Sequence, residues 1–135
     1  MAKRPGRMWI YSPKRQKVPD YLKVEIQKKA DQLVETTLKP EHIKTPPEDY
    51  EFNYIVDIFT QWHSGFFYFC AKYHSPGPRA ISPYFETKFA RLKYIGNNRF
   101  NLAYMRHTGQ WWEIYDNISP DECLSAIRDE PHFLP

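Results

Sequence analysis

The sequence predicts an α+β fold, in which an N-terminal amphipathic helix packs on a four- to five-stranded antiparallel β-meander and a short C-terminal helix closes the domain. Two observations carry this prediction. Apolar residues recur with helical spacing near residues 19–38 and 119–130, whereas between these segments they alternate with period two. The central segment, residues 52–115, also holds eighteen of the chain's twenty-three Phe, Tyr and Trp residues, which favour strands.

The first element is a basic segment. Six Lys and Arg residues and no acidic residues lie before Val18, whereas the rest of the chain has thirteen basic and sixteen acidic residues. The formal net charge of +3 therefore comes from this segment. We interpret residues 1–18 as a flexible basic arm and residues 19–135 as a single domain. Such an arm can attract phosphate-rich partners, and a solubilising extension is the alternative interpretation.

A helix follows from about Pro19 to Leu38. Its apolar residues share one stripe, at Leu22, Ile26, Ala30, Leu33, Val34 and Thr37. Pro40 should end the helix because proline lacks a backbone N–H group, and Pro46-Pro47 mark an extended connector.

Strands begin at Phe52. The turn His63-Ser64-Gly65 predicts a hairpin, and residues 75–83 are expected to form a proline-rich loop. Three further strands are expected over residues 88–95, 99–106 and 110–115, separated by turns at residues 96–98 and 108–109. Alternation predicts one face that points into the core: Phe52, Tyr54, Val56, Phe67, Phe69, Leu92, Tyr94, Phe100, Leu102, Trp112 and Ile114. The opposite face then holds Tyr68, Lys72, Arg91, Lys93, Arg99, Asn101, Trp111 and Tyr115, together with the carboxylates of Asp57 and Glu113.

The C-terminal helix has a strong capping signal. Ser119 is the expected N-cap, Pro120 is the first helical residue, and Glu122 completes a capping box. Pro131 should end this helix.

Residues 88–133 contain a KFARLKY strand, an FNLAYMRHTGQWWEIY hairpin, an SPDECLSAI helix and a final Asp-Glu-Pro segment before Phe133. In order and aromatic spacing these motifs resemble the bacterial domain-of-unknown-function family 3024, with Phe100 in place of a family tryptophan. The N-terminal helix and the first hairpin agree with this family in layout only. The resemblance implies a helix before an antiparallel sheet, and it implies no activity. The basic arm and the long connector after the first helix depart from the family's shorter pattern.

The sequence shows no catalytic constellation. The five histidines are not paired at metal-ligand spacing. No serine or cysteine lies in the strand–turn–helix context that positions the nucleophile of a hydrolase. Only five glycines are present, and none forms a glycine-rich phosphate-binding loop. We therefore expect no enzyme activity, no cofactor and no metal. Cys70 and Cys123 lie in apolar patterns and are expected to be buried free thiols. No apolar run approaches the length of a membrane span, so we expect a cytoplasmic protein without membrane contact.

Binding is the function that the residues favour. Aromatic residues interleaved with Lys and Arg on a sheet face are typical of platforms for RNA or single-stranded DNA, where bases stack and cations meet phosphates. The expected nucleic-acid-binding residues are Lys3, Arg4, Arg7, Lys14, Arg15 and Lys17 in the arm and Arg91, Lys93, Trp111 and Tyr115 on the sheet.

A protein partner, or a place as a small subunit of a larger assembly, is the alternative hypothesis. The arm contains an apolar cluster in which Trp9 and Tyr11 could dock on another protein, and the last strand leaves a sheet edge open to strand addition. Cross-strand aromatic pairs also stabilise sheets without binding anything, so the aromatic face has a purely structural interpretation as well.

Overall fold

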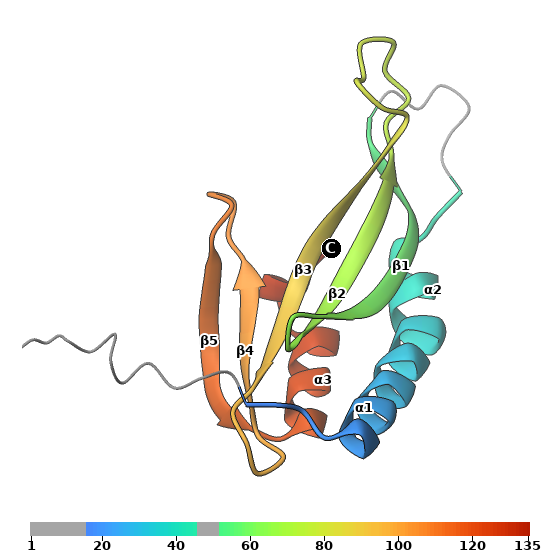
Figure 1. The fold of residues 1–135 in the computed structure, drawn as a ribbon. Helices are drawn as coiled ribbons and strands as arrows, with labels where there is room; N and C mark the ends of the chain where they lie inside the picture. The colour runs from blue at the N-terminus through green and yellow to red at the C-terminus, as the bar shows by residue number, and fades with distance from the viewer. Residues whose placement is uncertain (1–15, 46–51) are drawn as a thin grey trace, which may run out of the picture.

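The computed structural model describes residues 16–45 and 52–135, and it confirms the α+β fold (Figure 1). The N-terminal helix has three consecutive parts: α1 (Asp20–Leu33), the π-helical turn η2 (Val34–Leu38) and α2 (Lys39–His42). Five strands follow: β1 (Tyr54–His63), β2 (Phe66–His74), β3 (Tyr84–Tyr94), β4 (Phe100–Met105) and β5 (Trp111–Ile118). The chain then forms α3 (Pro120–Asp129) and the 3₁₀ turn η3 (Pro131–Phe133).

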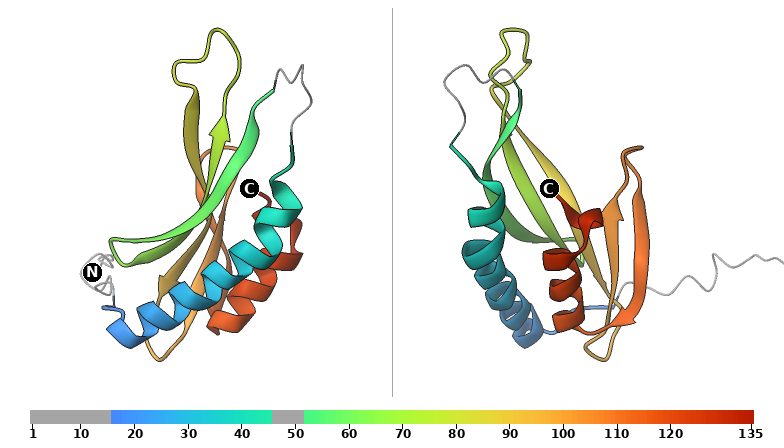
Figure 2. Two further views of the ribbon diagram at one scale, coloured as in Figure 1. Left: turned by 90° about the vertical axis from the view of Figure 1, so that its right-hand side faces the viewer. Right: turned by 180° about the vertical axis from the view of Figure 1, so that it is seen from behind.

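The strands form one sheet in the order β1-β2-β3-β4-β5, and every neighbouring pair is antiparallel. This is the meander that short connections dictate. Both α1 and α3 lie against the same face of the sheet (Figure 2). No helix of the described chain covers the opposite face, which we call the helix-free face.

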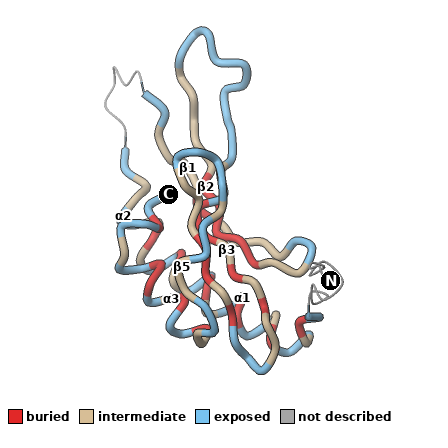
Figure 3. The backbone as a smooth tube through the Cα atoms, turned by 90° about the vertical axis from the view of Figure 1, so that its left-hand side faces the viewer, coloured by how far each residue is buried: buried red, intermediate tan, exposed pale blue. Residues whose placement is uncertain are grey.

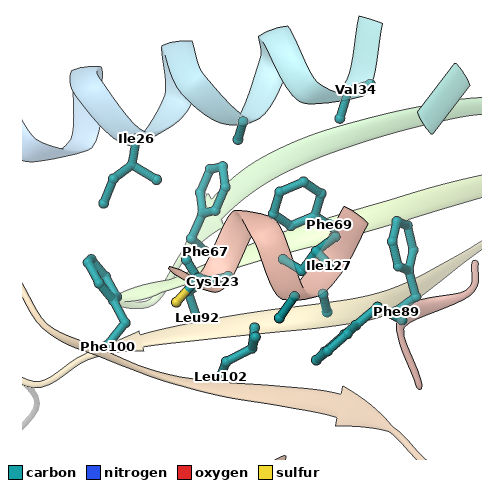
Figure 4. Close-up of a cluster of buried hydrophobic side chains, with 14 of the residues drawn as sticks. Ile26, Val34, Phe67, Phe69, Phe89, Leu92, Phe100, Leu102, Cys123 and Ile127 are labelled. Atoms are coloured by element: carbon teal, nitrogen blue, oxygen red, sulfur yellow. The ribbon is translucent and has the colours of Figure 1, made fainter. Parts of the chain in front are cut away.

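The core lies between the two helices and the sheet. Figure 4 shows side chains from α1, β2, β3, β4 and α3 converging there. Leu22 and Ile26 of α1, Phe67 and Phe69 of β2, and Cys123 of α3 are all at most 1% exposed. Burial of one such large apolar side chain contributes about 1.5–3 kcal/mol. Both cysteines are free and buried, as predicted.

The prediction that Pro40 ends the first helix is wrong, because the helix continues to His42. The π turn explains how. The Lys39 N–H group donates to the carbonyl of Val34, five residues earlier, so the turn before Pro40 is wider than an α-helical one. The wider turn accommodates the proline ring, which would otherwise clash with a carbonyl four residues back.

The start of β1 also departs from the predicted alternation. The register of β1 against β2 shifts between Ile55 and Asp57, which is the signature of a bulge. As a result Ile55 packs against the core, whereas the ring of Tyr54 contacts His74 at 5.2 Å and Phe52 is 74% exposed. One extra residue reverses the inward and outward positions.

The strand pair β2–β3 projects beyond the helices (Figures 1 and 2). Strand β3 begins at Tyr84, earlier than the predicted residue 88, while residues 75–83 form the expected loop. Buried residues gather at the helix-covered end of the molecule, and the tip of the projecting hairpin is exposed (Figure 3). The capping box of α3 is confirmed, since Ser119 Oγ accepts from the Glu122 N–H group and Glu122 Oε1 accepts from the Ser119 N–H group.

Candidate nucleic-acid interface

Strand alternation places a set of aromatic and basic side chains on the helix-free face. In β3, Leu92 and Tyr94 belong to the core, so Arg91 and Lys93 point to the other side of the sheet. In β2, Phe67 and Phe69 are buried against the helices, so Phe66 and Tyr68 lie on the helix-free face. The antiparallel register sets Arg91 opposite Tyr68 and Lys93 opposite Phe66.

At the centre of this face, the guanidinium of Arg91 lies between two aromatic rings. Its Cζ atom is 4.8 Å from the ring centroid of Phe66 and 5.0 Å from that of Trp111. Trp111 comes from β5, two strands away from β3. The intervening residue opposite Arg91 on β4 is Ala103, whose small side chain leaves room for the tryptophan ring to reach across. We call Phe66, Tyr68, Arg91 and Trp111 the central cluster.

Among residues 16–45 and 52–135, the Arg91 side chain makes no hydrogen bond. Its side chain is 18% exposed, and an Nη atom lies 4.0 Å from a carboxylate oxygen of Glu113, too far for a hydrogen bond. Nε is buried and has no hydrogen-bond partner among the described residues. A guanidinium held in place by flanking rings, with donors to spare, is suited to an anionic ligand.

Further cations surround the central cluster. The Nζ atom of Lys88 lies 5.4 Å from the ring centroid of Tyr68, and Lys72 and Lys93 occupy the same face. The expected carboxylate of Glu113 is present there, and Glu86 stands opposite Lys72. Asp57 pairs in register with Lys72, as expected for this face, and it also reaches Lys39 of the N-terminal helix at 3.4 Å because β1 is an edge strand. The helix-free face therefore carries more positive than negative side chains.

Acidic charge gathers instead on the helix side. A groove of about 430 Å³ between β5 and α3 is lined by Tyr115, Ile118, Asp121, Glu122, Ser125, Ala126, Asp129 and Glu130. Backbone hydrogen bonding at the α3 N-terminus lowers the pKa of Glu122, and a side-chain hydrogen bond from Arg128 lowers the pKa of Asp129. The two faces of the sheet thus differ in charge.

The structure brings together three of the four predicted sheet residues, namely Arg91, Lys93 and Trp111. The expectation that Tyr115 shares their face is wrong. The register of β4 against β5 shifts between Leu102 and Ala103, so Tyr115 pairs with Leu102 on the helix side. Its hydroxyl donates a hydrogen bond to Glu130 of α3.

Of the expected arm residues, the structure describes Lys17, which is exposed. Lys3, Arg4, Arg7, Lys14 and Arg15, and the expected partner-binding Trp9 and Tyr11, lie outside the described residues. The place where the arm joins the fold is defined, because Val18 is buried and a Cβ atom on Gly96 would lie 3.7 Å from the Gln16 side chain. Gly96 lies just beyond β3, three residues after Lys93. Residues 16–18, the part of the arm segment that the structure describes, therefore lie at the end of β3 that carries Lys93.

Sequence reasoning did not assign Phe66 and Lys88 to the site. The alternation of β2 could have assigned Phe66, because Phe66 lies two residues before Tyr68 and residues two apart on a strand share a face. Lys88 could not be placed in this way, because the register of β3 against β2 shifts between Phe69 and Cys70 and leaves Phe89 as an extra, buried residue.

Three further observations concern metal binding, membrane crossing and thiol chemistry. Residues 16–45 and 52–135 contain no group of three or more His, Cys, Asp or Glu side chains placed to hold a metal ion. None of the helices described has both the length and the apolar character needed to cross a bilayer. Burial raises the pKa of the Cys70 thiol to about 11 and that of Cys123 to about 12, so neither is poised as a nucleophile.

Comparison with known protein families gives a match for this chain. A family model described as a domain of unknown function, DUF3024, matches residues 18–135. The chain belongs to this family. The match reaches well beyond the C-terminal motifs, since it also includes the N-terminal helix and the first hairpin. No curated protein and no solved structure matches the chain.

In this DUF3024 domain, the matched region starts at Val18, the first buried residue that the structure describes. The central cluster and the helix-free face therefore lie inside the family domain, whereas the basic arm precedes it. The two parts of the candidate interface can be tested separately for this reason.

Proposed function

We propose that this protein binds single-stranded nucleic acid, RNA or DNA, on the helix-free face of the sheet, with the basic arm adding phosphate contacts and without catalysing a reaction. The observation that carries the proposal is the Arg91 guanidinium, held between Phe66 and Trp111 with Nε unpaired among the described residues. Phosphates and base edges are the acceptors that such a group recognises in nucleic acids.

The surroundings of Arg91 support the same class of ligand. Lys88 and Lys93 supply point charges for neighbouring phosphates, and the partly exposed rings of Phe66 and Trp111 offer stacking surfaces worth about 1–3 kcal/mol per base. The acidic groove lies on the other side of the sheet, so it does not oppose an anion approaching the helix-free face. Six positive charges before Val18 add non-specific attraction that depends steeply on salt.

The test is fluorescence anisotropy with labelled single-stranded RNA and DNA across a salt titration, using the full chain. Arg91→Lys keeps the charge and removes the planar guanidinium, and we expect it to weaken binding. Lys93→Gln should also weaken binding, whereas Lys28→Gln makes the same charge change on the exposed surface of α1 and should have little effect.

Replacement of the six basic arm residues by Gln should reduce the dependence of log K on log salt by up to about 4, at roughly 0.7 for each phosphate that the arm no longer neutralises. The proposal would be overturned if native protein and the arm variant bound nucleic acid equally weakly at low salt.

A protein partner is the second candidate function, and the β5 edge favours it. In the described sheet β5 pairs only with β4, and its Trp112 is 52% exposed with Arg106 Cζ 4.9 Å from the ring centroid. Exposed Trp with Arg at a sheet edge is typical of protein hot spots. Light scattering after size exclusion would test a second copy as the partner: a dimer that persists at high salt and is lost in Trp112→Ala supports this candidate.

A further inference from the structure

A second aromatic cluster lies on the helix-free face, on the projecting part of the β2–β3 hairpin. The ring of His74 is 5.2 Å from that of Tyr54 and 5.1 Å from that of Tyr84. Lys72 places its Nζ atom 4.9 Å from the ring centroid of Tyr84. Tyr84 is 47% exposed, and the buried Nδ1 atom of His74 has no hydrogen-bond partner in the described structure. We call Tyr54, Lys72, His74 and Tyr84 the hairpin cluster.

The two clusters belong to one continuous face. Strand β2 keeps its alternation over its whole length, with Phe67, Phe69 and Ala71 buried against the core. Phe66, Tyr68, Cys70, Lys72 and His74 therefore all point to the helix-free side. The bulge between the clusters lies on β3, where Phe89 is the extra residue, so it does not reverse the parity of β2.

One lysine lies between the clusters. Lys88 stands opposite Cys70, midway along β2, and Lys72 of the hairpin cluster follows two residues after Cys70, with Glu86 and Asp57 opposite it on the neighbouring strands. Phe66 and His74 are eight positions apart on β2, which corresponds to roughly 26 Å along the strand. The face thus presents aromatic rings, then a lysine, then aromatic rings, in the order in which a strand of bases and phosphates would meet them.

We propose that the nucleic-acid site is a track that runs along β2 from the central cluster to the hairpin cluster, so that full affinity requires a strand long enough to contact both. This inference rests on the proposed function. A stacked strand rises about 3.4 Å per nucleotide, so about eight nucleotides suffice to span the track. An oligonucleotide of four nucleotides contacts one cluster at a time.

The experiment compares labelled single-stranded oligothymidylates of four and twelve nucleotides, bound to the full chain at fixed low salt. The twelve-nucleotide strand should bind more tightly, and Tyr84→Ala should weaken its binding by roughly tenfold, as expected for one lost base stack. Tyr84→Ala should change the binding of the four-nucleotide strand little. Longer strands also offer more binding registers, but this statistical gain is the same for the native protein and the variant.

Matched variants isolate the cause. Tyr21→Ala removes an even more exposed tyrosine from α1, away from the track, and should leave binding of both strands unchanged. Tyr84→Phe retains the ring and should restore the affinity for the longer strand. Circular dichroism confirms that each variant is folded.

The outcomes separate the two proposals. If both strands bind and Tyr84→Ala affects neither, the track is wrong while the central site stands. If neither strand binds the native protein, the proposed function fails and the track fails with it, which would favour a protein ligand for this face.

Discussion

The hydroxyl of Tyr115 donates a hydrogen bond to Glu130 Oε2 at 2.7 Å, and this bond ties the edge strand β5 to the end of helix α3. The contact exists because the irregular pairing of β4 with β5 turns Tyr115 toward the helices. The hydrogen bond to a carboxylate raises the pKa of Tyr115 above its usual value. Tyr115 is therefore a structural residue of the helix side.

Tyr115→Phe should lower the urea midpoint of unfolding without changing binding to nucleic acid, because it removes the bond to α3 and leaves the helix-free face intact. Since the folded pKa of Tyr115 is raised, its contribution is present below the unfolded pKa and is lost as pH rises through the folded pKa. The difference between native protein and variant should shrink in alkali. Weaker nucleic-acid binding at an unchanged midpoint would contradict this assignment.

Ser119→Ala should destabilise the fold by about 1 kcal/mol, because it removes the N-cap of α3. The effect is measured by urea denaturation at pH 7. The capping box also lowers the pKa of Glu122, so the contribution of this carboxylate is present above its unfolded pKa and is lost as pH falls through the folded pKa. Native protein should thus lose part of its advantage over the variant in acid. Equal stabilities at neutral pH would show that the cap contributes nothing.

Gly109→Ala should destabilise the fold by about 1 kcal/mol, because the residue has a φ of +83° in the turn between β4 and β5. No atom lies within 4 Å of the added Cβ, so any cost comes from the backbone. Gly77→Ala is the matched control, since it also meets no atom and its φ lies outside the left-handed region. Thermal unfolding of both variants should show a lower midpoint for Gly109→Ala alone.

Thiol reactivity should report unfolding. Burial raises the pKa of Cys70 to about 11 and that of Cys123 to about 12, so native protein at pH 8 holds almost no thiolate. We expect slow alkylation by iodoacetamide without denaturant and rapid alkylation of both cysteines in urea, measured by mass spectrometry. Rapid labelling of either residue in native protein would contradict the burial of its thiol.

The elements determined by local chemistry were predictable from the sequence. The capping box at Ser119, the hairpin turn at Ser64-Gly65 and the proline-rich loop at residues 75–83 all depend on a few neighbouring residues, and all were confirmed. Pro40 was misjudged because its usual effect assumes a regular α-helix. The π turn that accommodates it has no simple sequence signal.

The inward and outward positions were predictable only as far as the strands stay regular. In β2 the side chains alternate regularly from Phe66 to His74, and so the sequence could predict the aromatic face. In β5 the irregular pairing reverses Tyr115 relative to Trp111, and in β1 the bulge near Val56 turns Ile55 inward. Bulges depend on how two strands settle against each other over the core, so one strand's sequence does not reveal them.

The stacking of Arg91 between Phe66 and Trp111 was likewise beyond sequence reasoning. It joins three strands, and it depends on the small side chain of Ala103 lying between β3 and β5. Alternation could assign Arg91 and Trp111 to one face but could not show that they touch.

The projecting end of the hairpin has a dynamic consequence. The first five residues of β3, Tyr84 to Lys88, include no buried residue, and the buried part of the strand begins at Phe89. Amide hydrogens at this end can exchange with solvent through local opening, while those near Leu92 await global unfolding. A bound partner that covers the hairpin would slow exchange at those amides selectively. Hydrogen exchange at the amides of residues 84–88 can therefore map where a ligand binds, without any substitution in the protein.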